Sequence, residues 1–184
     1  AVGVDNIDIL ACTQRRIPVG HTPDVLTDAT ADLTLAILLA AARRLPEAAL
    51  DAKEGHWGTW SPTGWLGTDL RGAQLGIVGM GKIGRAVAER ALGFGIRLAY
   101  ANPTKIESAA VHLPLDELLR TSDFVSLHCP LNESTRALIG ERELMLMKES
   151  AILVNAARGP VVDSDALLRA LTNGWIAAAA LDVT

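Results

Sequence analysis

Apolar runs at short, regular intervals set the pattern of the chain from residue 74 onward. These runs alternate with segments in which apolar residues recur at helical spacing, so strands and helices should alternate. The predicted strands lie at 75–78, 97–101, 124–127, 151–154 and 176–181, and the predicted helical segments follow residue 84 and occupy 115–121, 132–147 and 163–173. Strands that alternate with helices form a parallel sheet covered on both faces. The pattern therefore predicts an α/β fold.

A long apolar helix is the main prediction for the first half of the chain. Thr22 can cap it, and Pro23 suits its first turn because proline fixes a helical φ and lacks an N–H that would be unpaired there. Between Val25 and Ala40 apolar residues cover more than one side. This favours either a buried core helix or a helix at a subunit interface. A second helix is predicted at 45–55.

Tryptophans gather in the irregular segment 56–70. Trp57, Trp60 and Trp65 stand there among glycines and a proline. A tryptophan side chain is costly to leave in water. The segment should therefore pack on its own domain, on a partner subunit or on a ligand, and the first is the simplest expectation.

A glycine-rich turn links the strand at 75–78 to a helix. The sequence Gly-Met-Gly-Lys-Ile-Gly gives each glycine a separate task. Gly79 allows the sharp turn out of the strand, Gly81 leaves room for a pyrophosphate, and Gly84 lets the helix pack closely on the strand. Phosphates would sit at the helix N-terminus. With the strand–helix repeat beyond it, this turn predicts a Rossmann-type doubly wound parallel sheet, with helices on both faces, that binds a dinucleotide. A tight turn without a ligand is the alternative.

Composition and charge exclude several functional classes. The 184 residues are 49% hydrophobic and 21% charged, which is typical of a globular protein, and the net charge of −4 lacks the basic footprint of a nucleic-acid binder. Cys12 and Cys129 cannot form a disulfide framework, and no signal peptide is visible, so a cytoplasmic location is expected. The most apolar segment, 29–42, carries Asp32 and is too short to span a bilayer, which predicts no membrane association. No metal-ligand spacing or Ser-His-Asp arrangement is evident.

Polar residues at the strand ends are the candidate ligand contacts, because ligands of such sheets bind outside the carboxyl ends of the strands. After the second strand an acidic residue would hold the ribose 2′-hydroxyl of NAD, but this chain has Asn102. Asn102 and Thr104 can donate hydrogen bonds to a 2′-phosphate, and Lys105 supplies positive charge. The segment thus favours NADP, and NAD stays possible because the segment has no arginine that could make a bidentate contact with the phosphate.

Three further strand-end residues have two interpretations each. Arg158 can hold a carboxylate with two parallel hydrogen bonds and stabilise charge on an adjacent oxygen, or it can pair with Asp182 or another acid. Asp182 can accept a hydrogen bond from a nicotinamide carboxamide, or it can cap a helix. For His128, a wall beside the adenine or a structural hydrogen bond is favoured over catalysis.

Several motifs in the same order resemble the D-isomer-specific 2-hydroxyacid dehydrogenases over the whole chain. The segments that carry the resemblance are 2–8, 30–32, 69–72, 79–84, 128–131, 155–159 and 180–184. Within that family, the tryptophan segment with Pro62, the run 23–28 and the missing acidic residue are most similar to glyoxylate/hydroxypyruvate reductases. The resemblance implies reduction of a small 2-oxo acid, glyoxylate or hydroxypyruvate, to the D-2-hydroxy acid.

The resemblance also implies roles for single residues. Arg158 matches the arginine that binds and polarises the 2-oxo acid, and the backbone of Val2 and Gly3 matches the part that holds the substrate carboxylate. Trp60 matches a position that reaches the partner subunit's substrate site in a homodimer formed through the helix from Pro23. The other matches are to cofactor contacts: Thr30, Lys82, Ile83, Pro130, Ala156 and Asp182.

The family's catalytic glutamate and histidine would both fall beyond Thr184, and most of the N-terminal substrate domain has no counterpart here. We therefore expect a fragment, in which residues 1–21 are the remnant of the substrate domain and residues 22–184 form the dinucleotide-binding domain with its linking helix. Two functional alternatives stay open. One is a dehydrogenase of the same family for phosphoglycerate or 2-ketogluconate, and the other is a non-catalytic dinucleotide-binding module similar to the corepressors of this superfamily. An adenosylhomocysteinase-like domain is disfavoured by the motif at 155–159.

Overall fold

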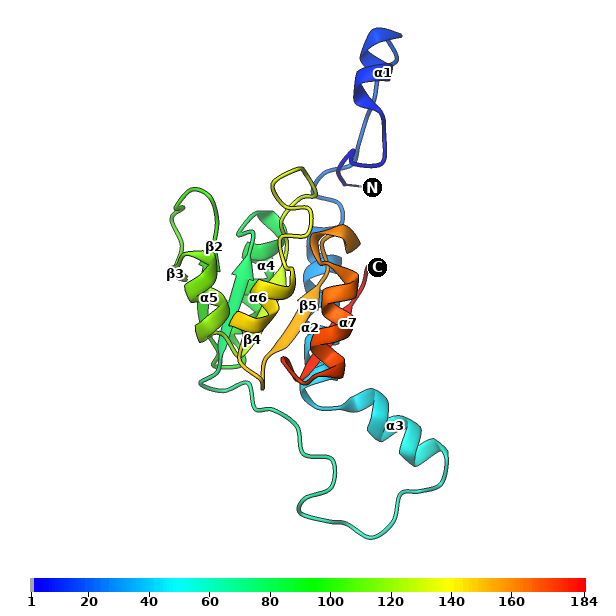
Figure 1. Cartoon of the computed structure of the whole chain (residues 1–184), viewed down its shortest axis with the longest axis vertical. Helices are drawn as coiled ribbons and strands as arrows, with labels where there is room; N and C mark the ends of the chain where they lie inside the picture. The colour runs from blue at the N-terminus through cyan, green and yellow to red at the C-terminus, as the bar shows by residue number, and fades with distance from the viewer. Residues whose placement is uncertain (1) are drawn as a thin grey trace.

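A single parallel sheet of six strands organises the computed structural model, which describes residues 2–184 (Figure 1). The strands are β1 (Gln74–Val78), β2 (Arg97–Ala101), β3 (Val111–His112), β4 (Phe124–Leu127), β5 (Ile152–Asn155) and β6 (Ala178–Leu181). Their order is β3-β2-β1-β4-β5-β6, and every neighbouring pair is parallel. The five predicted strands and the Rossmann-type fold are confirmed. The edge strand β3 was not predicted, because two residues are too few to show a periodic pattern.

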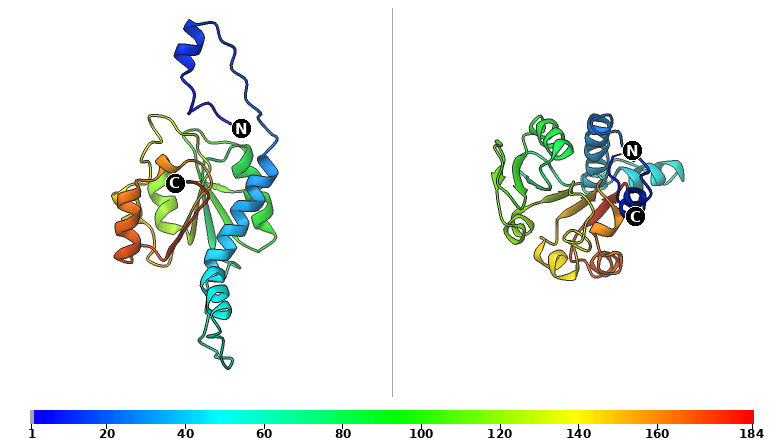
Figure 2. Two further views of the ribbon diagram at one scale, coloured as in Figure 1. Left: turned by 90° about the vertical axis from the view of Figure 1, so that its right-hand side faces the viewer. Right: turned by 90° about the horizontal axis from the view of Figure 1, so that it is seen from above.

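Helices cover both faces of the sheet, as Figure 2 shows in the view from above. One face carries α2 (Thr27–Ala42) and α4 (Lys82–Leu92), which pack on each other. The other carries α5 (Leu115–Thr121), α6 (Glu141–Leu146) and α7 (Ser164–Thr172). Within 132–147, where helical turns were expected, the chain makes turns before α6 begins at Glu141.

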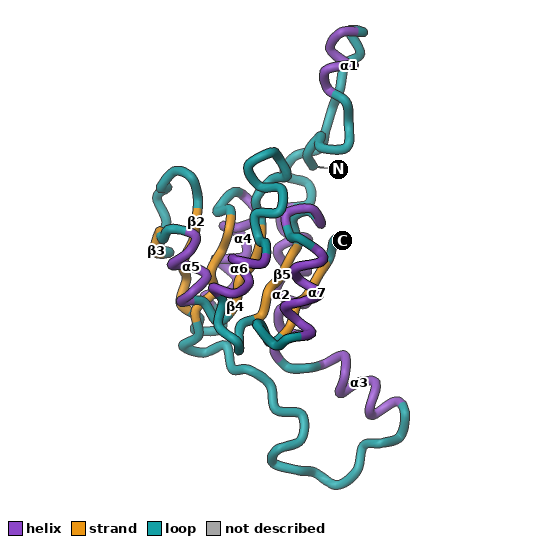
Figure 3. Tube along the Cα trace, in the orientation of Figure 1, coloured by secondary structure: helices purple, strands orange, loops and turns teal. Residues whose placement is uncertain are grey.

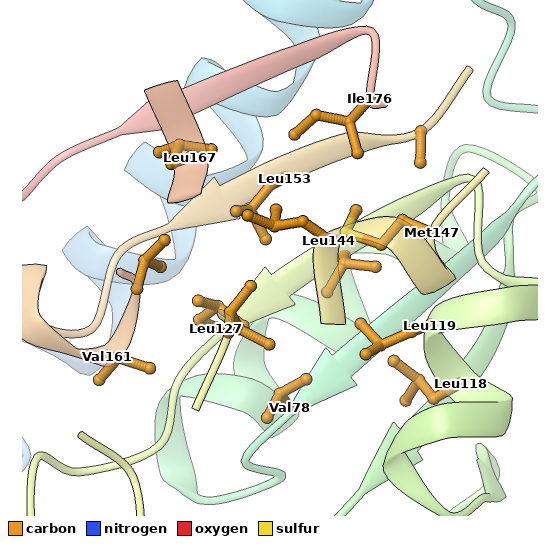
Figure 4. Packing of buried hydrophobic residues seen from close by; sticks show 14 of the residues in the cluster. Val78, Leu118, Leu119, Leu127, Leu144, Met147, Leu153, Val161, Leu167 and Ile176 are labelled. Carbon is orange, nitrogen blue, oxygen red and sulfur yellow. The ribbon is translucent and has the colours of Figure 1, made fainter. Parts of the chain in front are cut away.

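Two apolar cores lie between the sheet and its helix layers. Leu127 and Leu153 point from the strands toward α6 and α7, where Leu144 meets them (Figure 4). Phe124 belongs to the other core, with Leu38 of α2. Successive residues of β4 thus point to opposite faces, and both faces are buried. This burial explains why the strands are continuous apolar runs rather than an apolar–polar alternation.

Helix α2 begins later than its sequence predicts. Its first residue is Thr27 and its N-cap is Leu26, so the predictions of a start at Pro23 and a cap at Thr22 are wrong. Asp24 has a φ of 73°, a left-handed conformation that cannot continue a right-handed helix, and a turn follows in which the carbonyl of Asp24 accepts from the N–H of Thr27. Before this turn, α1 (Ile9–Gln14) projects from one end of the molecule (Figure 1).

The tryptophan segment projects from the opposite end, after α3 (Leu45–Lys53) (Figure 3). Trp57 is 62% exposed and Trp60 is 82% exposed, so the expectation that both pack on their own domain is wrong. The reason is that α3 leads the chain away from the sheet. Trp65 is half-buried beneath the guanidinium of Arg44, which lies 4.8 Å from the ring centroid. Among the described residues, no helix has both the length and the apolar character needed to cross a membrane.

Candidate active site

The glycine turn between β1 and α4 has the geometry of a phosphate cradle. Gly79 has a φ of 97°, and a Cβ there would lie 2.6 Å from the backbone nitrogen of Cys129. A Cβ on Gly84 would lie 2.4 Å from the carbonyl oxygen of Gly79. By contrast, no described atom lies within 4 Å of the Cβ position of Gly81, the N-cap of α4. Gly79 and Gly84 are thus required by the protein's own packing, whereas the space at Gly81 is open and fits a pyrophosphate at the helix N-terminus.

Asn102 connects the end of β2 to the glycine turn. Its Oδ1 accepts a hydrogen bond of 2.8 Å from the backbone N–H of Met80. The amide Nδ2 therefore remains the group with which Asn102 can donate to a ligand. Thr104 and Lys105 are exposed in the loop that follows. The hydroxyl of Tyr100 fixes the position of this loop, because it donates to the carbonyl of Ile106 and accepts from the N–H of Ile106.

The first turn of α4 presents Lys82 and Ile83 at the mouth of the cradle. The Nζ of Lys82 lies 2.5 Å from Oδ1 of Asp24, in the turn before α2. Both side chains are more than half exposed, so this ion pair is solvated and contributes little stability. The Lys82 ammonium is therefore available to a phosphate that approaches the helix N-terminus.

A cleft of about 410 Å³ lies where the ends of β4 and β5 meet the first residues of the chain. The predicted residues Val2, Gly3, Ile83, Pro130 and Ala156 line it together with Arg158. The other lining residues are Val4, Asp5, His128, Cys129, Leu131 and Ala157. A second hollow lies in the tryptophan segment, and none of its lining residues belongs to the cleft. The structure thus brings six of the predicted substrate and cofactor residues from distant parts of the chain to one cleft at the edge of the sheet.

Asn155, at the end of β5, fixes the backbone that carries Arg158. Its buried side chain donates from Nδ2 to the carbonyl of Arg158 at 2.9 Å and accepts at Oδ1 from the N–H of Ala157 at 3.0 Å. A short 3-10 helix, η1 (Gly159–Val161), follows at once. The two hydrogen bonds of Asn155 hold residues 155–158 in a tight turn. From this turn the side chain of Arg158 extends into the cleft.

The Arg158 guanidinium is held by acceptor oxygens of three residues. Nε lies 3.1 Å and 3.3 Å from the two carboxylate oxygens of Asp5, one terminal nitrogen donates to the carbonyl of Val2, and the other donates to the carbonyl of Ala157. The hydrogen bond from Arg158 holds the pKa of Asp5 below its ordinary value. Arg158 does pair with an acid, but the acid is Asp5. Because a guanidinium carries five N–H groups, one remains on each terminal nitrogen for a ligand.

His128 is held by a structural hydrogen bond. Its Nε2 lies 2.8 Å from the hydroxyl oxygen of Ser126, one of the two interpretations that its sequence position allowed. Nδ1 is buried without a hydrogen-bond partner among the described residues. Burial lowers the pKa of His128 to about 4, so the imidazole is neutral near pH 7. Burial also raises the pKa of the neighbouring Cys129 thiol, which argues against a reactive thiolate in the cleft.

Comparison with known proteins gives the family. The family model described as D-isomer specific 2-hydroxyacid dehydrogenase, NAD binding domain, matches residues 35–184. The chain belongs to this family. It is 52% identical over 192 aligned residues to a glyoxylate reductase of Thermococcus litoralis, an alignment that covers all of this chain and 58% of the relative. The chain thus spans somewhat more than half the length of the curated relatives that it matches.

Solved structures agree with this assignment. A crystal structure of a Thermus thermophilus protein matches with a TM-score of 0.96 and 52% identity, over all of this chain and 59% of that one. A D-lactate dehydrogenase of Aquifex aeolicus, solved with NAD and lactic acid, matches with a TM-score of 0.91 and 36% identity, over all of this chain and 56% of that one. The glycine turn and the sheet edge therefore lie in a domain that has the fold of the NAD-binding domain of this family.

Three predicted site residues lie outside the cleft lining and also outside the glycine turn and the loop after β2. Thr30 is half-buried in the first turn of α2, and its carbonyl accepts from the hydroxyl of Thr34. Asp182 is exposed just beyond β6, where its N–H donates to the carbonyl of Asn155. Trp60 lies in the projecting segment beyond α3, so within one chain it does not meet Arg158 (Figure 1). Asp5 is the residue that sequence reasoning missed, although it stands two positions after Gly3.

Proposed function

We propose that this chain is the dinucleotide-binding part of an enzyme that reduces glyoxylate or hydroxypyruvate to the D-2-hydroxy acid, with NADPH preferred and NADH as a possible second cofactor. The observation that carries the proposal is Arg158, which keeps two free N–H groups in a cleft that also reaches Ile83 of the glycine turn. A small carboxylate at Arg158 would thus lie beside the dinucleotide. The close relatives named glyoxylate reductase support this substrate class.

The cleft residues account for substrate binding and polarisation. When bound, the nicotinamide supplies the hydride. Arg158 binds the 2-oxo acid and stabilises the negative charge that develops on its carbonyl oxygen. The backbone of Val2 and Gly3 holds the substrate carboxylate. Pro130, Leu131 and Ala156 give the cleft an apolar wall that excludes water and strengthens these electrostatic contacts.

The preference for NADPH rests on the end of β2. Position 102 carries no carboxylate to accept the ribose 2′-hydroxyl of NAD or to repel a 2′-phosphate. The Nδ2 of Asn102 and the hydroxyl of Thr104 would donate to the phosphate, and the exposed Lys105 would add charge. The remaining cofactor contacts in the proposal are Thr30, Lys82, Ile83 and Asp182. Asp182 would accept a hydrogen bond from the carboxamide of the nicotinamide.

We further propose that the protein is a cytoplasmic homodimer formed through the outer side of α2. Leu33 is 40% exposed there, and Val25 and Leu26 are exposed just before the helix. Large apolar side chains exposed along one element are typical of an interface. Trp60, in the projecting segment, would reach the substrate site of the partner subunit. Residues 1–21 would belong to the substrate domain, which the projection of α1 from the rest of the molecule and the 70% exposure of Leu10 support (Figure 1).

The experiment that tests the proposal is glyoxylate-dependent oxidation of NADPH by the full-length gene product, with NADH in parallel. A substrate panel with hydroxypyruvate, 2-ketogluconate and phosphohydroxypyruvate separates the alternatives within the family. Arg158→Gln removes the charged donor pair and should lower kcat/KM for glyoxylate by about 10²–10³-fold, the usual loss for one donor to a developing oxyanion. Cofactor binding without reduction of any 2-oxo acid would instead favour a non-catalytic module.

A further inference from the structure

Building on the proposed function, we propose that Asp5 is a positioning residue for Arg158. Its carboxylate anchors the guanidinium through Nε, which leaves one N–H on each terminal nitrogen free to hold the 2-oxo acid. Asp5 does not touch the substrate in this account. It sets the orientation of the group that does.

The contacts around Arg158 show why an anchor at Nε matters. An arginine side chain has several rotatable bonds, and fixing it in one rotamer costs conformational free energy unless partners hold it. Val2 and Ala157 contribute only neutral carbonyl acceptors. Asp5 is the charged acceptor, and it meets Nε with both of its oxygens. Hydrogen bonds between charged groups are about twice as strong as neutral ones, so Asp5 dominates the orientation of the guanidinium.

The backbone between Val2 and Asp5 is shaped for this contact. Gly3 has a φ of 87°, which disfavours any residue with a side chain. A Cβ at Gly3 would lie 2.8 Å from Oδ1 of Asp5 and 2.9 Å from a terminal nitrogen of Arg158. The side chains of Asp5 and Arg158 therefore pack directly against Gly3. The two residues that form this ion pair are 153 positions apart in the sequence. A solvated pair between flexible surface side chains would not need such a backbone.

A competing interpretation predicts the opposite sign. If Asp5 merely occupied the place of the substrate carboxylate, its removal would free the full charge of Arg158 and tighten the binding of 2-oxo acids. If Asp5 positions Arg158, its removal lets the guanidinium leave the productive geometry and weakens binding. The direction of the change in KM separates the two.

The test uses the full-length gene product with Asp5→Ala, Asp5→Asn and the matched control Asp8→Asn. Asp8 lies on the same segment and caps α1 by accepting from the N–H of Ala11 at 2.7 Å, a role that asparagine also fills. The measurements are kcat and KM for glyoxylate, the inhibition constant of oxamate, and the dissociation constant of NADPH from fluorescence.

Positioning predicts that Asp5→Ala raises both KM for glyoxylate and the inhibition constant of oxamate about tenfold or more. Asp5→Asn, which keeps an acceptor oxygen, should recover most of this loss yet remain at least about twofold above the wild type. NADPH affinity should stay within about twofold in every variant, and Asp8→Asn should behave as the wild type.

A fall in either constant, or wild-type values in the alanine variant, overturns the role of Asp5. Should Asp5→Ala fail to fold, the asparagine variant decides alone: a KM at or below that of the wild type contradicts the proposal. If the wild-type protein neither reduces glyoxylate nor binds oxamate, both the proposed function and the role of Asp5 are overturned. An active wild type with an unaffected Asp5→Ala variant overturns only the positioning role.

Discussion

Alanine substitutions at Gly81 and Gly84 should separate cofactor binding from folding. A Cβ at Gly84 would lie 2.4 Å from the carbonyl oxygen of Gly79 and 3.2 Å from a methyl carbon of Ile77, so α4 must move away from β1. Such overpacking typically costs about 1–3 kcal/mol. At about 2–4 °C per kcal/mol for a chain of this size, Gly84→Ala should lower Tm by roughly 2–12 °C. A Cβ at Gly81 meets nothing within 4 Å, so the Tm of Gly81→Ala should stay within a few degrees of the wild type.

The same methyl group at Gly81 would stand in the space left for the pyrophosphate. NADPH affinity of Gly81→Ala should therefore fall about tenfold or more, although the fold is intact. Thermal unfolding followed by circular dichroism and NADPH titration followed by fluorescence measure the two effects on the same samples. Wild-type NADPH affinity in Gly81→Ala would refute the placement of the dinucleotide. Wild-type Tm in Gly84→Ala would refute the close packing of α4 on β1.

Three further predictions concern pH, cofactor choice and assembly. Burial lowers the pKa of His128 from 6.5 to about 4, so the unfolded state takes up a proton first as pH falls. The free energy of unfolding should therefore drop between pH 6.5 and about 4 by more in the wild type than in His128→Gln, as denaturant titrations at several pH values will show. Lys105→Ala should raise KM for NADPH up to about fivefold, the usual range for an exposed ion pair, and leave KM for NADH unchanged in steady-state assays. Leu33→Asp should raise the dimer dissociation constant at least about tenfold in sedimentation equilibrium, because it buries an unpaired carboxylate; an unchanged constant would place the interface elsewhere.

The sheet could be predicted from sequence because each strand is a continuous apolar run bounded by turn residues. The start of α2 could not, since the reason for it is a left-handed residue at Asp24, and neither composition nor periodicity marks an aspartate as left-handed. Trp57 and Trp60 show a different limit. Their large apolar side chains indicate that some surface should cover them. They do not indicate that the chain after α3 projects away from the sheet, where its own domain cannot cover them.

The residues of the candidate site also fall into some that the sequence could predict and some that it could not. The carboxyl ends of parallel strands lie along one edge, so topology alone places Asn102, His128 and Arg158 on the same edge once the strands are assigned. The acid that pairs with Arg158 was not predicted: the sequence suggested Asp182 or another acid, and nothing local in the sequence points to Asp5. Asp182 follows a strand of the same sheet, whereas Asp5 reaches Arg158 from the first residues of the chain.

The ion pair between Asp5 and Arg158 makes two parts of the molecule depend on each other. Arg158 belongs to the sheet through Asn155, and it belongs to the first residues of the chain through Asp5 and the carbonyl of Val2. A change in the placement of residues 2–5 therefore changes the orientation of the guanidinium, even where the sheet is unchanged. Conversely, a ligand that accepts hydrogen bonds from the free N–H groups of Arg158 binds to a side chain that also holds Val2 and Asp5 in place. The orientation of the Arg158 guanidinium is thus set by an ion pair between two segments that no local sequence pattern connects.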